Sequence, residues 1–120
     1  MTTITLPTLA DGERYAGLIL DTEGKPTHHL ILLLGDTEAN WDNAKKFAAE
    51  IGGELPTRQE QALLYANCKA GFKPDWYWSS EQPASYSDYA WMQYFDNGFQ
   101  YTFTLMGSAC RARAVRRLAI

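Results

Sequence analysis

The residues of this chain that could do chemistry are aromatic rings. Twelve of the sixteen Phe, Trp and Tyr residues lie between Phe72 and Phe103, and Lys73 is the only basic residue in that stretch. Tyr and Trp combine a large apolar surface with a polar tip, which makes them frequent at recognition surfaces. Because one small core cannot easily hold so many rings, we expect some of them to face solvent and to bind a ligand.

Residue types that carry out catalysis or hold metal ions are few and unsuitably spaced. Cys68 and Cys110 have no CxxC spacing, and we interpret both as buried thiols. His28 and His29 are adjacent, so in a strand they point to opposite faces and cannot share a metal ion; we interpret both as surface or turn residues. Neither histidine is close in sequence to Ser79-Ser80. We therefore predict no catalytic residue, no metal site, no cofactor and no enzymatic activity.

The charge distribution argues against nucleic acid as a partner. The net charge is −3, and between Asp75 and Leu105 there are four acidic residues and no Lys or Arg. Nucleic-acid-binding surfaces usually interleave Lys or Arg with stacking rings, because phosphate contacts dominate the affinity. Arg58 and the four arginines near the chain end are expected instead to anchor strands through ion pairs or carbonyls. Those four are Arg111, Arg113, Arg116 and Arg117.

Hydropathy predicts no contact with a membrane. The longest apolar run covers residues 30–34, far short of the roughly 18 residues of a membrane span. Residues 1–7 lack both the basic start and the apolar segment of a signal peptide. We expect a single domain over residues 1–120 that is synthesised in the cytoplasm.

The first half of the chain predicts a β-hairpin and a helix. Two apolar runs, residues 15–20 and 29–34, flank a segment that Gly24 and Pro26 mark as a turn. Asn40 then stands in an N-cap position. Apolar residues recur at helical spacing over residues 41–51, and Gly52-Gly53 ends the pattern.

A second helix has the clearest local signal. Thr57 followed by Glu60 is a capping box, in which the hydroxyl and the carboxylate bind free amides at a helix start. The apolar pattern continues to Cys68, and we expect the helix to end within residues 69–71.

The period then changes to two, which is typical of strands. We expect strands at residues 77–80, 89–95 and 99–105, with Asn97-Gly98 as a hairpin turn between the last two, and a closing strand at residues 110–118. The fold class is therefore predicted as α+β, with two helices packed on a small antiparallel sheet.

A set of markers in fixed order gives this chain a family resemblance. The markers are Trp41 with Ala44 and Ala48, Gly52-Gly53, the Leu-Pro-Thr-Arg-Gln-Glu of residues 55–60, the Trp-Tyr-Trp-Ser-Ser of residues 76–80, Ala90-Trp91, Phe95, Gly98 and the Arg-Ala-Val-Arg-Arg of residues 113–117. Over residues 40–118 the chain resembles bacterial and prophage domains with C-type-lectin-like folds. It is similar to the C-terminal domains of bacterial collagen-like adhesins, and more distantly to phage tropism determinants and formylglycine-generating enzymes.

The resemblance implies a scaffold of helices and terminal strands that holds a variable, ligand-binding face of late strands and loops. Here that face corresponds to residues 81–105, the region that composition singles out independently. It further implies a face open to diversification by a retroelement, for which the evidence would be a DNA template repeat beside the gene.

Two departures from related domains restrict the chemistry. Calcium-dependent lectins use paired acids and amides, whereas residues 81–84 and 91–93 do not supply the six to eight oxygens that Ca²⁺ prefers. Formylglycine-type oxidases need a pair of thiols near the C-terminus, where this chain has only Cys110. We expect neither calcium-dependent sugar binding nor oxidase activity.

Strand alternation predicts which residues form the face. Trp91 and Phe95 are assigned to the core, with Trp76 or Trp78 beneath them, and their neighbours to the opposite side. A register error of one residue would exchange the two sets. The predicted ligand-binding residues are Tyr86, Tyr89, Met92, Tyr94, Asp96, Asn97, Phe99, Tyr101 and Phe103.

The sequence thus predicts a calcium-independent recognition domain of phage or prophage type, with an association with the virion as a further expectation. Its ligand would be a protein or a cell-surface glycan. One alternative uses the same rings as a subunit contact, in a structural or assembly protein of a phage particle or in a homo-oligomer. Another alternative is a small inhibitor of a host protein.

Overall fold

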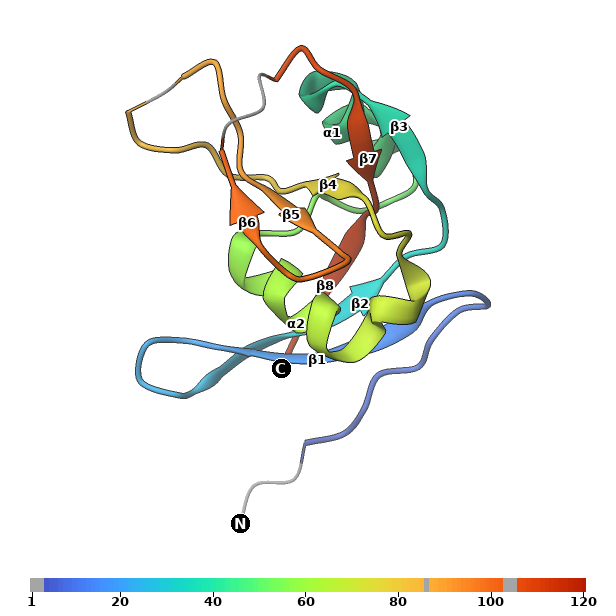
Figure 1. Ribbon diagram of the computed structural model, residues 1–120. Coiled ribbons are helices and arrows are strands. Elements are labelled where there is room, and N and C mark those ends of the chain that lie inside the picture. The colour runs from blue at the N-terminus through green and yellow to red at the C-terminus, as the bar shows by residue number, and fades with distance from the viewer. Residues whose placement is uncertain (1–3, 86, 103–105) are drawn as a thin grey trace.

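The chain forms an α+β domain with two α-helices, as the sequence predicts, but it contains a strand before the first helix, at residues 37–39, that was not predicted. The computed structural model describes residues 4–85, 87–102 and 106–120. The elements are β1 (Arg14–Leu20), β2 (Pro26–Leu32), β3 (Thr37–Ala39), α1 (Trp41–Glu50), α2 (Arg58–Cys68), the 3₁₀ turn η1 (Lys69–Gly71), β4 (Trp76–Trp78), β5 (Met92–Tyr94), β6 (Gln100–Tyr101), β7 (Cys110–Ala112) and β8 (Val115–Ala119) (Figure 1).

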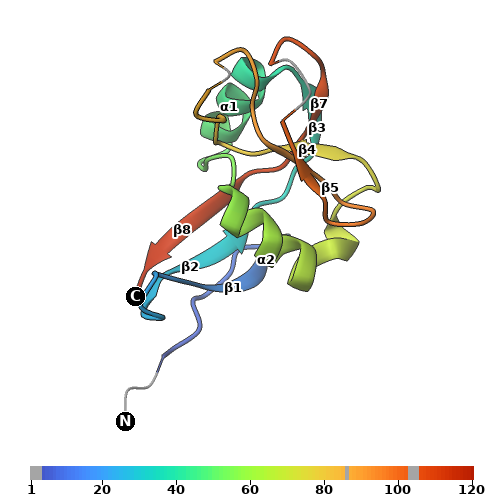
Figure 2. The same cartoon turned by 60° about the vertical axis from the view of Figure 1, so that its left-hand side comes forward.

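The strands form two sheets, so the prediction of one small antiparallel sheet is wrong in this respect. One sheet has the order β1-β2-β8 and the other the order β3-β7-β4-β5-β6. The second sheet is mixed, because β4 and β7 pair in parallel at Tyr77 and Arg111. The predicted closing strand splits into β7 and β8, and its two halves join different sheets. Helix α2 lies between the two sheets (Figure 2).

The predicted N-terminal hairpin is confirmed, but its second strand begins earlier than expected. β2 starts at Pro26, so both histidines lie within it, and their interpretation as surface or turn residues is wrong. His29 is buried, and its Nδ1 lies 2.8 Å from the hydroxyl oxygen of Tyr15. His28 binds Glu60 of α2 through Nε2.

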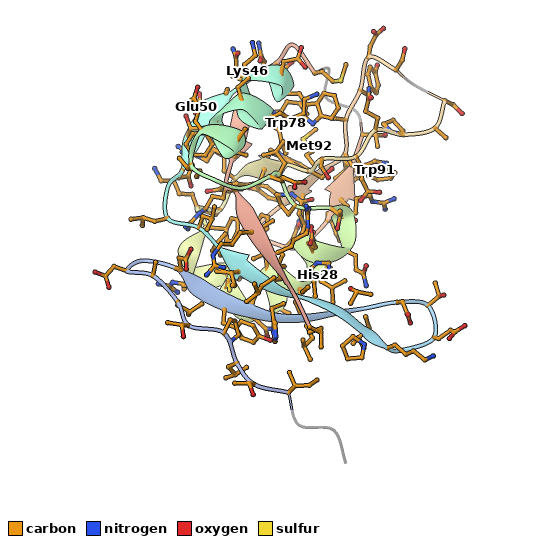
Figure 3. All side chains as sticks on the ribbon, turned by 180° about the vertical axis from the view of Figure 1, so that it is seen from behind. His28, Lys46, Glu50, Trp78, Trp91 and Met92 are labelled. Atoms are coloured by element: carbon orange, nitrogen blue, oxygen red, sulfur yellow. The ribbon has the colours of Figure 1, made fainter. Side chains whose placement is uncertain are left out.

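Helix α1 forms where its apolar spacing predicts. The Asn40 side chain accepts a hydrogen bond from the Asn43 amide, and the buried residues of the helix are Trp41, Ala44 and Ala48. Its charged residues face solvent, and Figure 3 shows Lys46 and Glu50 on the outer side of the helix.

The predicted capping box at the start of α2 is confirmed. Thr57 Oγ1 accepts from the Glu60 amide at 3.2 Å, and Glu60 Oε1 accepts from the Thr57 amide at 2.8 Å. The same carboxylate, 1% exposed, also binds Arg117 of β8 and His28 of β2. Burial acts to raise the pKa of Glu60, but the hydrogen bonds from Arg117, Thr57 and His28 outweigh it and lower the pKa.

Two hydrophobic cores form, and β4 contributes an aromatic ring to each. Trp78 belongs to the core beneath α1, while Tyr77 belongs to the core between α2 and the three-stranded sheet. Successive residues of a strand point to opposite faces, so neighbouring rings enter different cores. The chain therefore buries more of its rings than one small core would hold.

Candidate functional site

Four rings from the late strands lie together on one side of the five-stranded sheet. We call Trp76, Tyr94, Phe99 and Tyr101 the aromatic face. Trp76 stacks on Tyr94, with ring centroids 4.8 Å apart, and meets Tyr101 edge-on at 5.4 Å. Phe99 meets Tyr101 edge-on at 5.8 Å. Phe99 is 56% exposed and Tyr101 39%, whereas Trp76 and Tyr94 are half-buried.

The β5–β6 hairpin positions the exposed rings. Asn97-Gly98 does mark a hairpin turn, as predicted, but the loop spans the five residues 95–99 and the strands are shorter than expected. The Tyr94 amide donates to the Phe99 carbonyl at 2.8 Å, and the Gly98 amide donates to the Tyr94 carbonyl at 2.7 Å. Gly98 has φ of 82°, a conformation that suits glycine. Phe95 turns inward and stacks on Phe72 at 3.9 Å.

A network of buried amides fixes the opposite side of the hairpin to α2. Gln93 Nε2 donates to the Gln61 carbonyl at 3.1 Å, and Gln100 Nε2 donates to Gln93 Oε1 at 2.7 Å. Gln100 Nε2 also donates to the Arg58 carbonyl at 2.8 Å. Gln61 and Gln93 are each 1% exposed. Sequence reasoning missed this network, although the polar residues at alternate positions of β5 and β6 were its signal.

Met92 is not a surface residue, so its assignment to the ligand-binding set is corrected. It is fully buried, pairs with Trp78 across the sheet, and lies in the core beneath α1 (Figure 3). Trp91, which we assigned to the core, is only half-buried, and the Arg58 guanidinium stacks over its ring at 3.4 Å. At Trp91 and Met92 the strand therefore faces the opposite way from our prediction: Met92 points into the core, and Trp91 lies at its periphery. Phe95 is buried as predicted, because the strand ends at Tyr94 and the loop turns Phe95 inward.

The remaining predicted site residues are only partly brought together. Asp96 and Asn97 are exposed in the hairpin loop beside the aromatic face. Tyr89 is half-buried in the segment that precedes β5. Tyr86 and Phe103 lie outside the described residues. Trp76, which sequence reasoning treated only as a candidate core residue, joins the face because it pairs with Tyr94.

Two of the four acids in the ring-rich segment are bound within the protein. Asp75 Oδ2 accepts from Arg111 Nε at 3.1 Å, and Glu81 Oε2 accepts from the Arg58 amide at 2.6 Å. Arg111 also binds Asp36, to which the Tyr77 hydroxyl donates at 2.5 Å. Burial and this hydrogen bond raise the pKa of Tyr77. Asp88 and Asp96, by contrast, are exposed.

The thiols offer no reactive centre. Cys68 and Cys110 are free, Cys68 is buried, and Cys110 is partly buried. Burial raises the pKa of Cys68, and burial together with Asp75 and Glu38 raises that of Cys110 to about 11, so neither is a ready nucleophile at neutral pH. Among the described residues, no group of three or more His, Cys, Asp or Glu side chains could hold a metal ion.

The arginines are structural, as predicted. Arg113 donates to the carbonyls of Gly71 and Leu33. Arg116 and Arg117 form ion pairs with Glu13 and Glu60, respectively. No helix in the described part of the chain is long and apolar enough to cross a membrane.

Comparison with known proteins adds no relative. A scan against models of protein families finds no match, and a search among curated proteins finds none either.

Proposed function

We propose that this chain is a C-type-lectin-like recognition domain, of phage or prophage type, that binds its ligand through the aromatic face. The proposed ligand is a protein or a surface glycan, and binding requires neither calcium nor a catalytic step. The observation that carries the proposal is the contact between the four rings, which ends in the exposed Phe99 and Tyr101. Exposed aromatic patches of this kind mark interaction surfaces.

The arrangement of the scaffold supports the proposed fold likeness. β8 pairs with β2, so both halves of the chain meet in the three-stranded sheet, while the hairpin with the aromatic face lies in the other sheet. The proposed likeness implies a comparable separation between a scaffold with terminal strands and a binding face of late strands, and this arrangement is consistent with it.

The contacts of residues 81–82 support calcium independence. Glu81 Oε2 is held by the Arg58 amide, and the Gln82 side chain donates to the Ser87 carbonyl at 2.8 Å. These side chains therefore stabilise the loop itself, and among the described residues they form no group with other acids that could hold a metal ion, as Ca²⁺ ligands must.

The second candidate function is a permanent subunit contact. The 56% exposure of Phe99 favours this function as much as it favours recognition, because an exposed ring marks an interface without identifying its partner. The two candidates differ in what the isolated protein does. A subunit contact would hold the chain as an oligomer on dilution, whereas a recognition face would leave the rings accessible in a monomer.

The test is binding of the purified protein to a panel of bacterial surfaces, with and without a calcium chelator. The variant is Phe99→Ala/Tyr101→Ala, and the matched control is Leu118→Ala, an apolar residue 41% exposed on the other sheet. Saturable, chelator-resistant binding that is lost only in the double variant supports recognition. A stable oligomer that dissociates only in the double variant, with no surface binding, supports the subunit contact and refutes recognition.

A further inference from the structure

The hairpin loop that joins two rings of the aromatic face, Tyr94 and Phe99, carries an exposed acidic residue, Asp96. Asp96 is the second residue of the loop 95–99, and the hydrogen bond from the Tyr94 amide to the Phe99 carbonyl brings the ends of this loop together. Within the described part of the chain, the Asp96 carboxylate has no hydrogen bond and no ion pair.

In the part of the chain that the structure describes, no Lys or Arg forms an ion pair with this carboxylate. No Lys or Arg occurs between Lys73 and Arg111. Lys69 contacts the loop, but its ammonium binds the main-chain oxygen of Asp96 at 3.3 Å and lies over the Tyr65 ring at 5.1 Å. Tyr65 packs on Phe95, in the core that contains Tyr77, and so on the side of the sheet opposite the aromatic face.

Elsewhere the chain covers ring faces with its own cations. Lys45 lies over Trp41 at 3.7 Å, and Arg58 lies over Trp91 at 3.4 Å. Arg113 lies 5.4 Å from the Phe72 ring centroid. In the described residues neither Tyr94 nor Phe99 has such a cation, although the loop that joins them carries the exposed Asp96.

We infer that the ligand is a protein that presents an arginine to the aromatic face, with its guanidinium against Phe99 and its N–H groups on Asp96. The inference rests on the proposed function and names its partner chemistry. A guanidinium is planar, stacks on rings and binds a carboxylate through two parallel hydrogen bonds. The combination of an exposed ring and a carboxylate without a counter-ion matches both properties, which a neutral glycan lacks.

The direct experiment is an NMR titration of the protein with L-argininamide, and with L-citrullinamide as the uncharged control of similar shape. We expect saturable shifts confined to the amides of residues 94–99, seen with argininamide alone. Asp96→Asn should weaken this binding about fivefold, the upper end for an exposed charge pair, and remove most of its dependence on salt. Asp88→Asn, an exposed acid of the same segment, should leave it unchanged.

The same variants applied to the surface-binding assay separate this inference from the proposed function. Surface binding that is lost in Phe99→Ala/Tyr101→Ala but is insensitive to Asp96→Asn and to salt would overturn the arginine inference and leave recognition intact. Equal shifts with citrullinamide would overturn it as well. Surface binding that is unaffected by the double variant would overturn both.

Discussion

The Glu60 carboxylate joins three elements, and replacing it tests the energetics of the scaffold. It receives hydrogen bonds from Arg117 Nε and Nη2, both at 2.7 Å, from His28 Nε2 at 2.8 Å, and from the Thr57 amide at 2.8 Å. Glu60→Gln keeps the shape but removes the charge, and leaves Arg117 partly buried with a neutral partner. Loss of one member of a buried pair costs about 3–5 kcal/mol.

We expect the lower end of that range for Glu60→Gln, about 3 kcal/mol, because Arg117 keeps its second partner Glu54 at 2.6 Å. At about 4 °C per kcal/mol for a domain of this size, the midpoint of thermal unfolding should fall by about 12 °C. The control is Glu54→Gln, which changes the other partner of Arg117. Because the Glu54 side chain is 73% exposed, this control should cost at most about 1 kcal/mol.

Urea and thermal unfolding at pH 7 measure both variants. Because folding lowers the pKa of Glu60, its stabilising contribution is complete above the ordinary carboxyl pKa of 4.5 and is lost as the pH falls through the lower folded value. The difference between wild type and Glu60→Gln should therefore shrink in acid below pH 4.5. Equal losses for the two variants, or a difference independent of pH in this window, would refute the reasoning.

Three further predictions address the core, an ion pair and a close approach of the main chain. Met92→Ala should lower the free energy of unfolding in urea by about 2–5 kcal/mol, and Met92→Leu should lower it by less than about 1.5 kcal/mol, because Met92 is fully buried. Negligible losses for both variants would contradict the burial of Met92. The hydrogen bond from Arg116 is the main reason that the pKa of Glu13 is lowered, and an NMR titration should give a pKa of about 2. The contribution of Glu13 to stability should therefore be lost as the pH falls from 4.5 to about 2. An ordinary carboxyl pKa would contradict the ion pair between Glu13 and Arg116. Gly53→Ala should lower the free energy of unfolding by about 1–3 kcal/mol in the same assay, because a Cβ at this position would lie 2.4 Å from the Val115 carbonyl oxygen. An unchanged unfolding midpoint would show that the main chain moves apart at no measurable cost.

Local signals in the sequence predicted local structure well. The capping box at Thr57 and Glu60, the N-cap Asn40 and the Asn97-Gly98 hairpin are each determined by neighbours within about one turn. Such signals do not contain the pairing of distant strands. The sequence therefore predicted a strand over residues 110–118 but not its division between two sheets at residues 113–114.

Which residues of the ring-rich strands point into the core depends on partners far away in sequence. Alternation separates Trp91 from Met92, but it does not say which of them points inward. The choice is made by α1, whose core receives Met92, and by Arg58, whose guanidinium covers Trp91 at the periphery. An Arg–Trp contact of this kind lets a large ring remain half-exposed, which hydropathy alone treats as unfavourable.

The aromatic face is built as an extension of a core. Trp76 packs against the core that contains Trp78 and Met92, and Tyr94 stacks on Trp76. On the other side, the Gln93 amide fixes the same strand to α2. Rings held in this way lose little conformational freedom on binding, which raises the affinity available from a small surface.

This construction divides the face into two kinds of residue. Trp76 and Tyr94 are half-buried and contribute to the fold, so their replacement would change stability and binding together. Phe99 and Tyr101 are the exposed members, and their replacement should change binding with little effect on stability. Because the exposed pair lies on a hairpin whose loop and reverse side are held by main-chain and glutamine hydrogen bonds, these positions can vary in side chain while the scaffold is preserved.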